Sequence, residues 1–104
     1  FAVIGKPQDD DVLLICEGWS TGASLYESTG HPVIVAVDAG NLTPVAEVWR
    51  ILAPKAKMII MGDNDVHGKG QIEARKAALA CGGKYQIPQT PGMDWNDVLT
   101  FGGV

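Results

Sequence analysis

Two aspartates one residue apart, Asp63 and Asp65, directly follow an apolar run that ends at Gly62. Side chains alternate along extended backbone, so residues i and i+2 point to the same side. Two carboxylates held that close repel each other unless a proton or a cation lies between them. A hard cation such as Mg²⁺ prefers oxygen ligands of this kind. The spacing therefore predicts a divalent-metal site at this loop.

Acidic residues also follow the other predicted strands: Glu17, Asp38, Asp94 and Asp97. The carboxyl ends of parallel strands meet at one edge of a sheet, which is where open α/β folds bind ligands. Neighbouring strands lie about 4.8 Å apart, so acids on adjacent strand ends fall within reach of a shared ion. We expect these carboxylates to converge on Asp63. A solvated loop or a helix cap remains the alternative for each, and Asp38 in particular could cap the loop at Asn41.

The loop after the two aspartates is rich in glycine and carries Lys69, which suits either a phosphate contact or an ordinary exposed lysine. His67 is interpreted as a loop residue, because hard metals prefer oxygen ligands. Residues 62–69 are one residue too long for a Walker A loop, and Gly70 stands where that motif needs Ser or Thr. An EF-hand would need its bidentate acid where Ala74 stands, so both motifs are excluded.

The elements that must position these residues alternate between strands and helices. Apolar runs that do not alternate with polar residues indicate strands buried on both faces, as in parallel sheets. Strands are expected at 12–16, 33–37, 58–62 and 84–87. Helices are expected from a cap at Ser20 or Thr21 to near Gly30, at 43–52, at 71–81 and just after 94. This order predicts an α/β fold, Rossmann-like, with about four mostly parallel strands sandwiched by helices. Residues 1–5 are expected to form a short edge strand.

The second helix is expected to begin at Thr43-Pro44, an N-cap followed by proline. The spacing predicts a buried face made of Val45, Val48, Trp49 and Leu52. Trp19 is likewise assigned to packing. For Trp95, beside the last acids, packing and base stacking both remain open.

Composition limits the class of protein. The chain has 104 residues, 46% of them hydrophobic and 19% charged, which fits one globular domain. Apolar runs are far shorter than a membrane span needs, so no membrane association is expected. Cys16 and Cys81 have no CxxC spacing and are interpreted as reduced core thiols of a cytoplasmic protein. The net charge of −4 argues against a nucleic-acid-binding surface, unless bound metal ions face the phosphates.

Three motifs in order carry a resemblance to a known family: an apolar strand ending in Glu17-Gly18, a strand ending in Asp63-Asn64-Asp65, and Asp94-Trp95-Asn96-Asp97. Together they resemble the TOPRIM domain, shared by bacterial-type DNA primases, type IA and type II topoisomerases and several nucleases. The amino-acid sequence of residues 17–25 and 37–42 is most similar to that of plasmid- and phage-borne primases. One departure is Thr21, where many primases carry another acid, and it leaves the number of bound metals open.

The resemblance implies metal-dependent nucleotidyl transfer, namely RNA primer synthesis on single-stranded DNA from NTPs, beside a replicative helicase or helicase domain. It implies that Asp63 and Asp65 hold Mg²⁺ or Mn²⁺ and that Glu17 serves as general acid/base or as a further ligand. Asp97, with Asp94, would complete a second-metal or supporting position. The chain is then expected to be a single TOPRIM domain over 1–104, with 1–10 a preceding edge strand and linker, cut from a larger primase.

Two other functions stay open. The first is DNA cleavage by a TOPRIM nuclease or topoisomerase. A topoisomerase needs a nucleophilic tyrosine, whereas Tyr26 and Tyr85 lie in helix- and strand-like segments and are interpreted as structural. The second is a non-catalytic metal- or nucleic-acid-binding module of a plasmid mobilisation protein.

Overall fold

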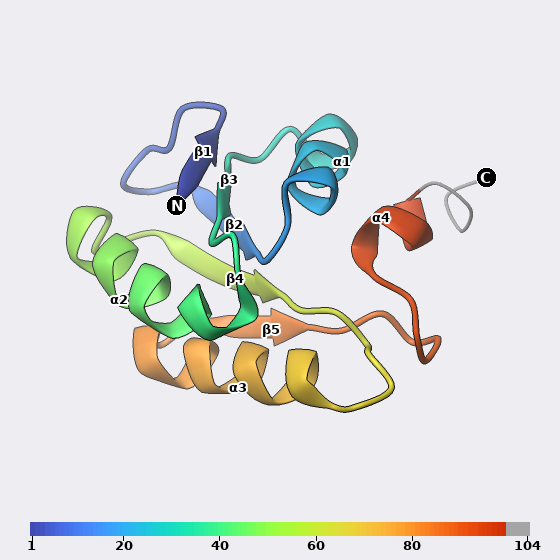
Figure 1. Ribbon diagram of the computed structural model, residues 1–104. Coiled ribbons are helices and arrows are strands. Elements are labelled where there is room, and N and C mark those ends of the chain that lie inside the picture. Colours follow the sequence, from blue (N-terminus) through green and yellow to red (C-terminus); the bar gives the residue numbers. More distant parts are fainter. Residues whose placement is uncertain (100–104) are drawn as a thin grey trace.

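The sheet is built from the apolar runs of the sequence. The computed structural model describes residues 1–99 and shows five strands in the order β1-β3-β2-β4-β5 (Figure 1). The strands are β1 (Ala2–Ile4), β2 (Val12–Cys16), β3 (Val33–Val35), β4 (Lys57–Met61) and β5 (Lys84–Gln86). Strands β3, β2, β4 and β5 are parallel, while β1 pairs antiparallel with β3 at one edge. The predicted α/β fold with a mostly parallel sheet is confirmed.

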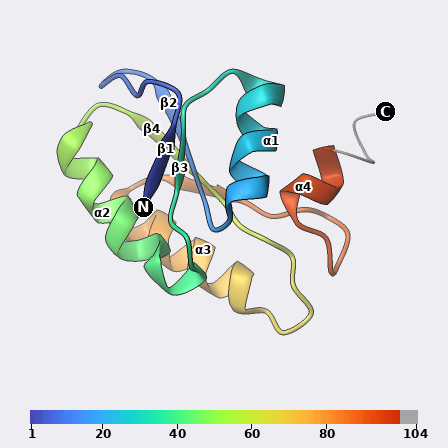
Figure 2. The same ribbon diagram turned by 45° about the horizontal axis from the view of Figure 1, so that its top comes forward.

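Helices cover both faces of the sheet (Figures 1 and 2). They are α1 (Trp19–Thr29), the short 3₁₀ helix η1 (Ala39–Asn41), α2 (Leu42–Leu52), α3 (Lys69–Cys81) and α4 (Trp95–Asp97). Because side chains alternate along a strand, Leu13 and Ile15 of β2 face the α2–α3 layer, and Leu14 and Cys16 face the α1 layer. The continuous apolar run at 12–16 is explained by this burial on both faces.

Helix α2 packs against the core through only half of the predicted face, together with Leu42 and Ala46. Leu42, Val45 and Ala46 are buried, whereas Val48 and Leu52 are 42% and 59% exposed. Alanines on α3 join the same cluster and allow the two helices to approach closely. The prediction that Val48 and Leu52 lie in the core is therefore wrong, and the predicted packing of Trp49 is confirmed.

Trp19 is also placed differently from the prediction. Helix α1 begins at Trp19 with Gly18 as its N-cap, before the expected cap at Ser20 or Thr21. Trp19 lies on the solvent side of the first turn and is 61% exposed, whereas Thr21 and Gly22 of the same turn are buried. None of the helices in residues 1–99 is both long and apolar enough to cross a membrane.

Strand β3 ends at Val35, two residues earlier than predicted, because the chain turns at Val37. Val37 has φ of +83°, and no other non-glycine residue among those described has a positive φ. A β-branched side chain in this region is strained. The backbone N–H of Val37 nevertheless donates to the carbonyl of Glu17, 2.8 Å away, which joins the turn to the end of β2.

This strain makes a prediction about stability. Val37→Gly should leave the free energy of unfolding unchanged or raise it by up to about 1 kcal/mol, because relief of the positive-φ cost exceeds the added chain entropy. Val66→Gly is the matched control, since Val66 is also an exposed loop valine but has no positive φ. It should lose about 0.5–1 kcal/mol. Urea unfolding measures both, and equal losses in the two variants would contradict the strain.

Candidate metal-binding site

The central pair of strands brings Glu17 and Asp63 together. Strands β2 and β4 are hydrogen-bonded neighbours, and their last residues, Cys16 and Met61, stand opposite each other. Glu17 follows the first directly and Asp63 follows the second after Gly62. Both acids thus leave the sheet at its carboxyl edge, side by side, as the alternating strand order predicts.

A hollow of about 270 Å³ opens at this edge. Four of its six lining residues are acids: Glu17, Asp63, Asp65 and Asp94. The first three stand at the ends of β2 and β4, and Asp94 arrives from the loop after β5. We call this feature the acidic hollow. Four carboxylates around one small space form a strongly negative site that suits a divalent cation.

Asp65 is oriented by the start of helix α3. Its Oδ2 accepts a hydrogen bond from the backbone N–H of Gly70 at 2.9 Å. Its Oδ1 is buried and has no hydrogen-bond partner in the described part of the chain. A buried carboxylate oxygen without a partner carries a desolvation cost that a bound cation would remove. This atom is the most specific sign that the site fits a metal.

The close approach at Gly70 explains why glycine stands there. A Cβ on Gly70 would lie 2.6 Å from the backbone oxygen of Asp63 and 3.0 Å from Oδ2 of Asp65. Any side chain would therefore push the helix away from the aspartate loop. Gly70, the residue that excludes a Walker A motif, is thus the point where helix α3 lies closest to the aspartate loop.

Among the acids of the hollow, Asp63 has a clearly raised pKa. Burial, followed by the charges of Glu17, Asp94 and Asp65, raises the pKa of Asp63 from 3.8 to about 6. Burial first, and then the charges of Asp63 and Glu17, raise the pKa of Cys16 to about 12. Cys16 is therefore a protonated thiol below the site. The predicted pair of reduced core cysteines is confirmed, because Cys16 and Cys81 are free and buried.

Asp94 and Asp97 cap helix α4 reciprocally. The N–H of Asp97 donates to Oδ1 of Asp94 at 2.8 Å, and the N–H of Asp94 donates to Oδ2 of Asp97 at 3.2 Å. This capping box leaves Asp94 at the rim of the acidic hollow, while Asp97 does not line it. The hydroxyl of Ser24 on α1 donates to Oδ1 of Asn96 at 2.5 Å, which ties α4 to α1.

Asn64 and Gln71 hold the two acidic loops together, and sequence reasoning missed both. The Asn64 side chain donates to the carbonyl of Pro88 at 2.7 Å and accepts from Nε2 of Gln71 at 2.6 Å. The backbone N–H of Asn64 donates to the carbonyl of Met93 at 3.1 Å. These bonds fix the loop that carries Asp94 onto the loop that carries the two aspartates. The only signal in the sequence was an amide between two acids.

The other predicted site residues lie outside the hollow. Asp38 is exposed, and its side chain accepts from the N–H of Gly40 at 2.8 Å as the cap of η1. The turn at Val37 carries it away from the edge, so the capping alternative describes its position. Lys69 is exposed as the first residue of α3, and His67 is an exposed loop residue. Neither lines the acidic hollow.

A metal ion in the acidic hollow would need further ligands in addition to the carboxylates. Within residues 1–99, no three His, Cys, Asp or Glu side chains already stand close enough to hold one ion. Mg²⁺ is commonly held by one or two carboxylates, with waters and substrate phosphates filling the rest of its shell. The free Oδ1 of Asp65 and the crowded Asp63 fit that arrangement.

The raised pKa of Asp63 predicts how the metal-free protein responds to pH. Since the folded pKa of about 6 lies above 3.8, the protonated form favours folding, and this contribution is lost as pH rises through 6. Asp63→Asn should therefore raise the free energy of unfolding at pH 7 in the presence of EDTA, with the gain disappearing toward pH 4. Urea unfolding at several pH values measures the difference. A variant less stable than wild type at pH 7 would contradict the crowded-carboxylate interpretation.

The comparisons with known proteins agree with this geometry. The model of the Toprim domain family matches residues 12–104. Two curated proteins of Escherichia coli, both named DNA primase TraC, are 39% and 37% identical to the chain in alignments of 83 residues that cover 73% of the chain. The chain spans only 6% and 8% of their lengths.

A solved structure shares the fold. The primase fragment of the bacteriophage T7 primase-helicase protein superposes with a TM-score of 0.69 at 18% identity, over 91% of this chain and 41% of that one. The described fold and the family match therefore coincide, and the match includes the strand ends at Glu17 and Asp63 and the segment with Asp94. The chain belongs to the Toprim domain family and resembles the Toprim domain of DNA primases.

Proposed function

We propose that this chain is the catalytic Toprim domain of a DNA primase, which joins NTPs into an RNA primer on single-stranded DNA. The observation that carries the proposal is the acidic hollow at the carboxyl edge of a Toprim sheet, in a chain similar to proteins named DNA primase. The whole-protein activity, the template, the NTPs, a helicase partner and a cytoplasmic location all belong to this proposal. The net charge of −4 is unfavourable for binding the DNA template, so we propose that a basic surface outside this chain binds it.

The roles of the residues follow from their positions. Asp63 and Asp65 would hold Mg²⁺ or Mn²⁺, with Asp94 at the rim as a further ligand or as a support for its waters. A cation held by these residues would neutralise charge on the triphosphate and help to align it for in-line attack by a 3′ hydroxyl. Glu17, half-buried just after the neighbouring strand β2, would accept the proton of that hydroxyl or serve as another ligand.

Lys69 and Asp97 have supporting roles. Lys69 is the first residue of α3, where the helix N-terminus and its own ammonium group both favour a phosphate. Asp97 would act on Asp94 through the capping box rather than on the metal directly. The placement of Asp38 favours a structural role in η1.

The test of this proposal separates synthesis from cleavage. The intact protein is incubated with single-stranded DNA, labelled NTPs and Mg²⁺, and a parallel reaction contains end-labelled DNA. We expect labelled RNA primers that disappear with EDTA and uncleaved DNA. Cleaved DNA without incorporation would replace the proposal with a nuclease or topoisomerase, for which Tyr26 and Tyr85 offer no nucleophile at the hollow. Binding of metal or DNA with neither product would indicate a non-catalytic module.

A further inference from the structure

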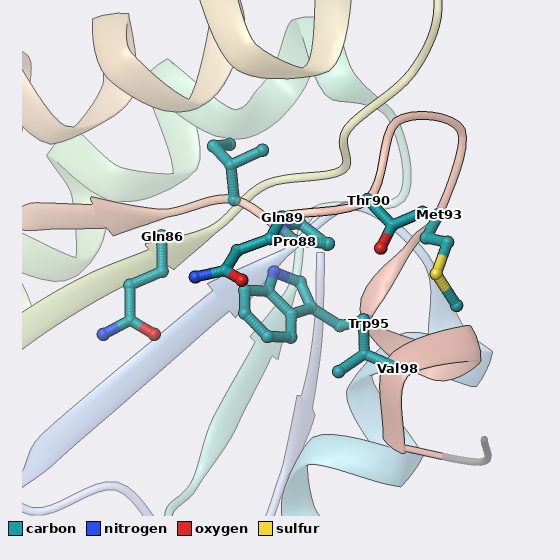
Figure 3. A pocket seen from close by; sticks show the side chains of 8 residues that line it. Gln86, Pro88, Gln89, Thr90, Met93, Trp95 and Val98 are labelled. Carbon is teal, nitrogen blue, oxygen red and sulfur yellow. The ribbon is translucent and has the colours of Figure 1, made fainter. Parts of the chain in front are cut away.

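A second hollow of about 540 Å³ lies next to the acidic hollow. Met93 lines both, so the two spaces share a wall. Figure 3 shows the indole of Trp95 in the middle of the side chains that line this second hollow, near Pro88 and the amide of Gln89, with Gln86 on β5 and Thr90 on the loop. We call it the Trp95 hollow. Its volume and its mixture of apolar surface with a few polar groups are typical of a small-molecule site.

The charges of the two hollows differ completely. None of the eight residues around the Trp95 hollow carries a formal charge, whereas four of the six around the acidic hollow are acids. A phosphate group, with its metal, therefore belongs on the acidic side. The group that fits the Trp95 side is neutral. A ligand with a charged end and a neutral end would place one in each space.

The lining groups favour a flat heterocycle as that neutral end. Trp95 is partly buried: its indole lines the hollow and also packs against the cluster on the α1 face, which holds the ring in place. Stacking on tryptophan tolerates every nucleobase, because each base has a π face. The amides of Gln86 and Gln89 are exposed, and each carries both a donor and an acceptor for the edge of a base.

The two hollows are held in a fixed relation. Trp95 follows Asp94 directly, so adjacent residues serve the two spaces. The Asn64 side chain holds the carbonyl of Pro88 at 2.7 Å, and the Asn64 N–H holds the carbonyl of Met93 at 3.1 Å. Pro88, which lines the Trp95 hollow, and Met93, which lines both hollows, are thus anchored to Asn64, the residue between Asp63 and Asp65.

We propose that the Trp95 hollow binds an unpaired nucleobase whose attached phosphate faces the acidic hollow. The base comes either from an NTP or from the single-stranded DNA, and both sources share the same stacking and amide contacts. This inference rests on the proposed function, since it names where that reaction would hold a base.

The experiment compares binding of paired ligands to the intact protein. In the presence of Mg²⁺, the ligands are each of the four ribonucleoside triphosphates against inorganic tripolyphosphate, and a single-stranded oligonucleotide against its abasic counterpart. Trp95→Leu keeps apolar bulk but removes the stack, and Trp95→Phe restores an aromatic ring. Trp19→Leu is the matched control, because Trp19 is exposed and lines neither hollow. Gln89→Ala changes an exposed side chain and tests the hollow without disturbing the core.

Trp95→Leu should weaken binding of the base-containing ligands about 5- to 150-fold, the range for loss of one base–aromatic stack. Gln89→Ala should weaken it about 2- to 10-fold. Tripolyphosphate and abasic DNA should bind as before, and Trp95→Phe should recover most of the loss. A loss confined to NTPs identifies the incoming nucleotide, and one confined to DNA identifies the template.

Unchanged binding of every base-containing ligand to both Trp95→Leu and Gln89→Ala would overturn the inference. So would an equal loss for tripolyphosphate and abasic DNA. These results are independent of catalysis. If the protein makes no primers but shows the base-specific loss, the proposed function is refuted and the inference about the Trp95 hollow stands. If it makes primers normally but shows no base-specific loss, the proposed function stands and the inference is refuted.

Discussion

Asp63→Asn and Asp65→Asn are each expected to reduce primer synthesis by the intact protein on the order of 10²–10³-fold or more, the scale of removing one preorganised electrostatic contact. Asparagine keeps the size of the side chain but loses the negative charge that a divalent cation needs. For Asp65, the amide could also disturb the bond from Gly70 N–H, which now meets Oδ2 at 2.9 Å. Incorporation of labelled NTPs measures the effect.

The control for both variants is Asp38→Asn. Asparagine caps helices about as well as aspartate, so the bond to Gly40 should survive and the fold should be unchanged. Because Asp38 lies outside the acidic hollow, its loss of charge should leave primer synthesis near the wild-type rate. If Asp38→Asn were as defective as Asp63→Asn, the reaction would use the whole sheet edge rather than this hollow.

Gly70→Ala is the second large effect. A Cβ there would stand 2.6 Å from the backbone oxygen of Asp63, so the aspartate loop or helix α3 must shift. Overpacking of this kind typically costs about 1–3 kcal/mol. Since the shift also disturbs how Asp65 is held, affinity for Mn²⁺ should fall about 10- to 100-fold, as for other residues that orient metal ligands. Urea unfolding and Mn²⁺ titration measure the two effects.

Gly40→Ala provides the comparison for Gly70→Ala. A Cβ on Gly40 would meet only Oδ1 of Asp38, at an ordinary 3.5 Å, and Gly40 is exposed. Stability should change by no more than about 0.5 kcal/mol, and Mn²⁺ affinity should not change. If Gly70→Ala behaved in the same way, the close approach would not be what holds the aspartates.

The sequence predicts the parts of this structure that follow from continuous apolar runs. The strands at 12–16 and 58–61 are buried on both faces, so their pattern is clear, and the acids that end them reach the same edge. Helix α2 shows the limit of the method. Its buried face includes Ala46, which belongs to the same core cluster as alanines of α3, whereas a pattern of large apolar residues also predicts Val48 and Leu52.

The site was predictable where it depends on strand order and unpredictable where it depends on loops. Asp38 lies outside the acidic hollow because the chain turns at Val37, and no glycine in the sequence marks the positive φ of that turn. Asn64 acts through the carbonyls of Pro88 and Met93, some 24 to 29 residues away along the chain, and such contacts leave no local pattern. The Trp95 hollow likewise exists only once the loop after β5 is folded back.

The central claim is that a divalent cation binds in the acidic hollow. The most direct measurement is titration of the ¹⁵N-labelled chain with Mn²⁺, whose paramagnetism broadens the NMR signals of nearby amides. We predict that the amides of Glu17, Asp63, Gly70 and Asp94 broaden first, that Asp63→Asn abolishes this, and that Mg²⁺ competes with it. First broadening at the three consecutive aspartates of residues 9–11 or around Asp38, with the hollow unaffected, would contradict the claim.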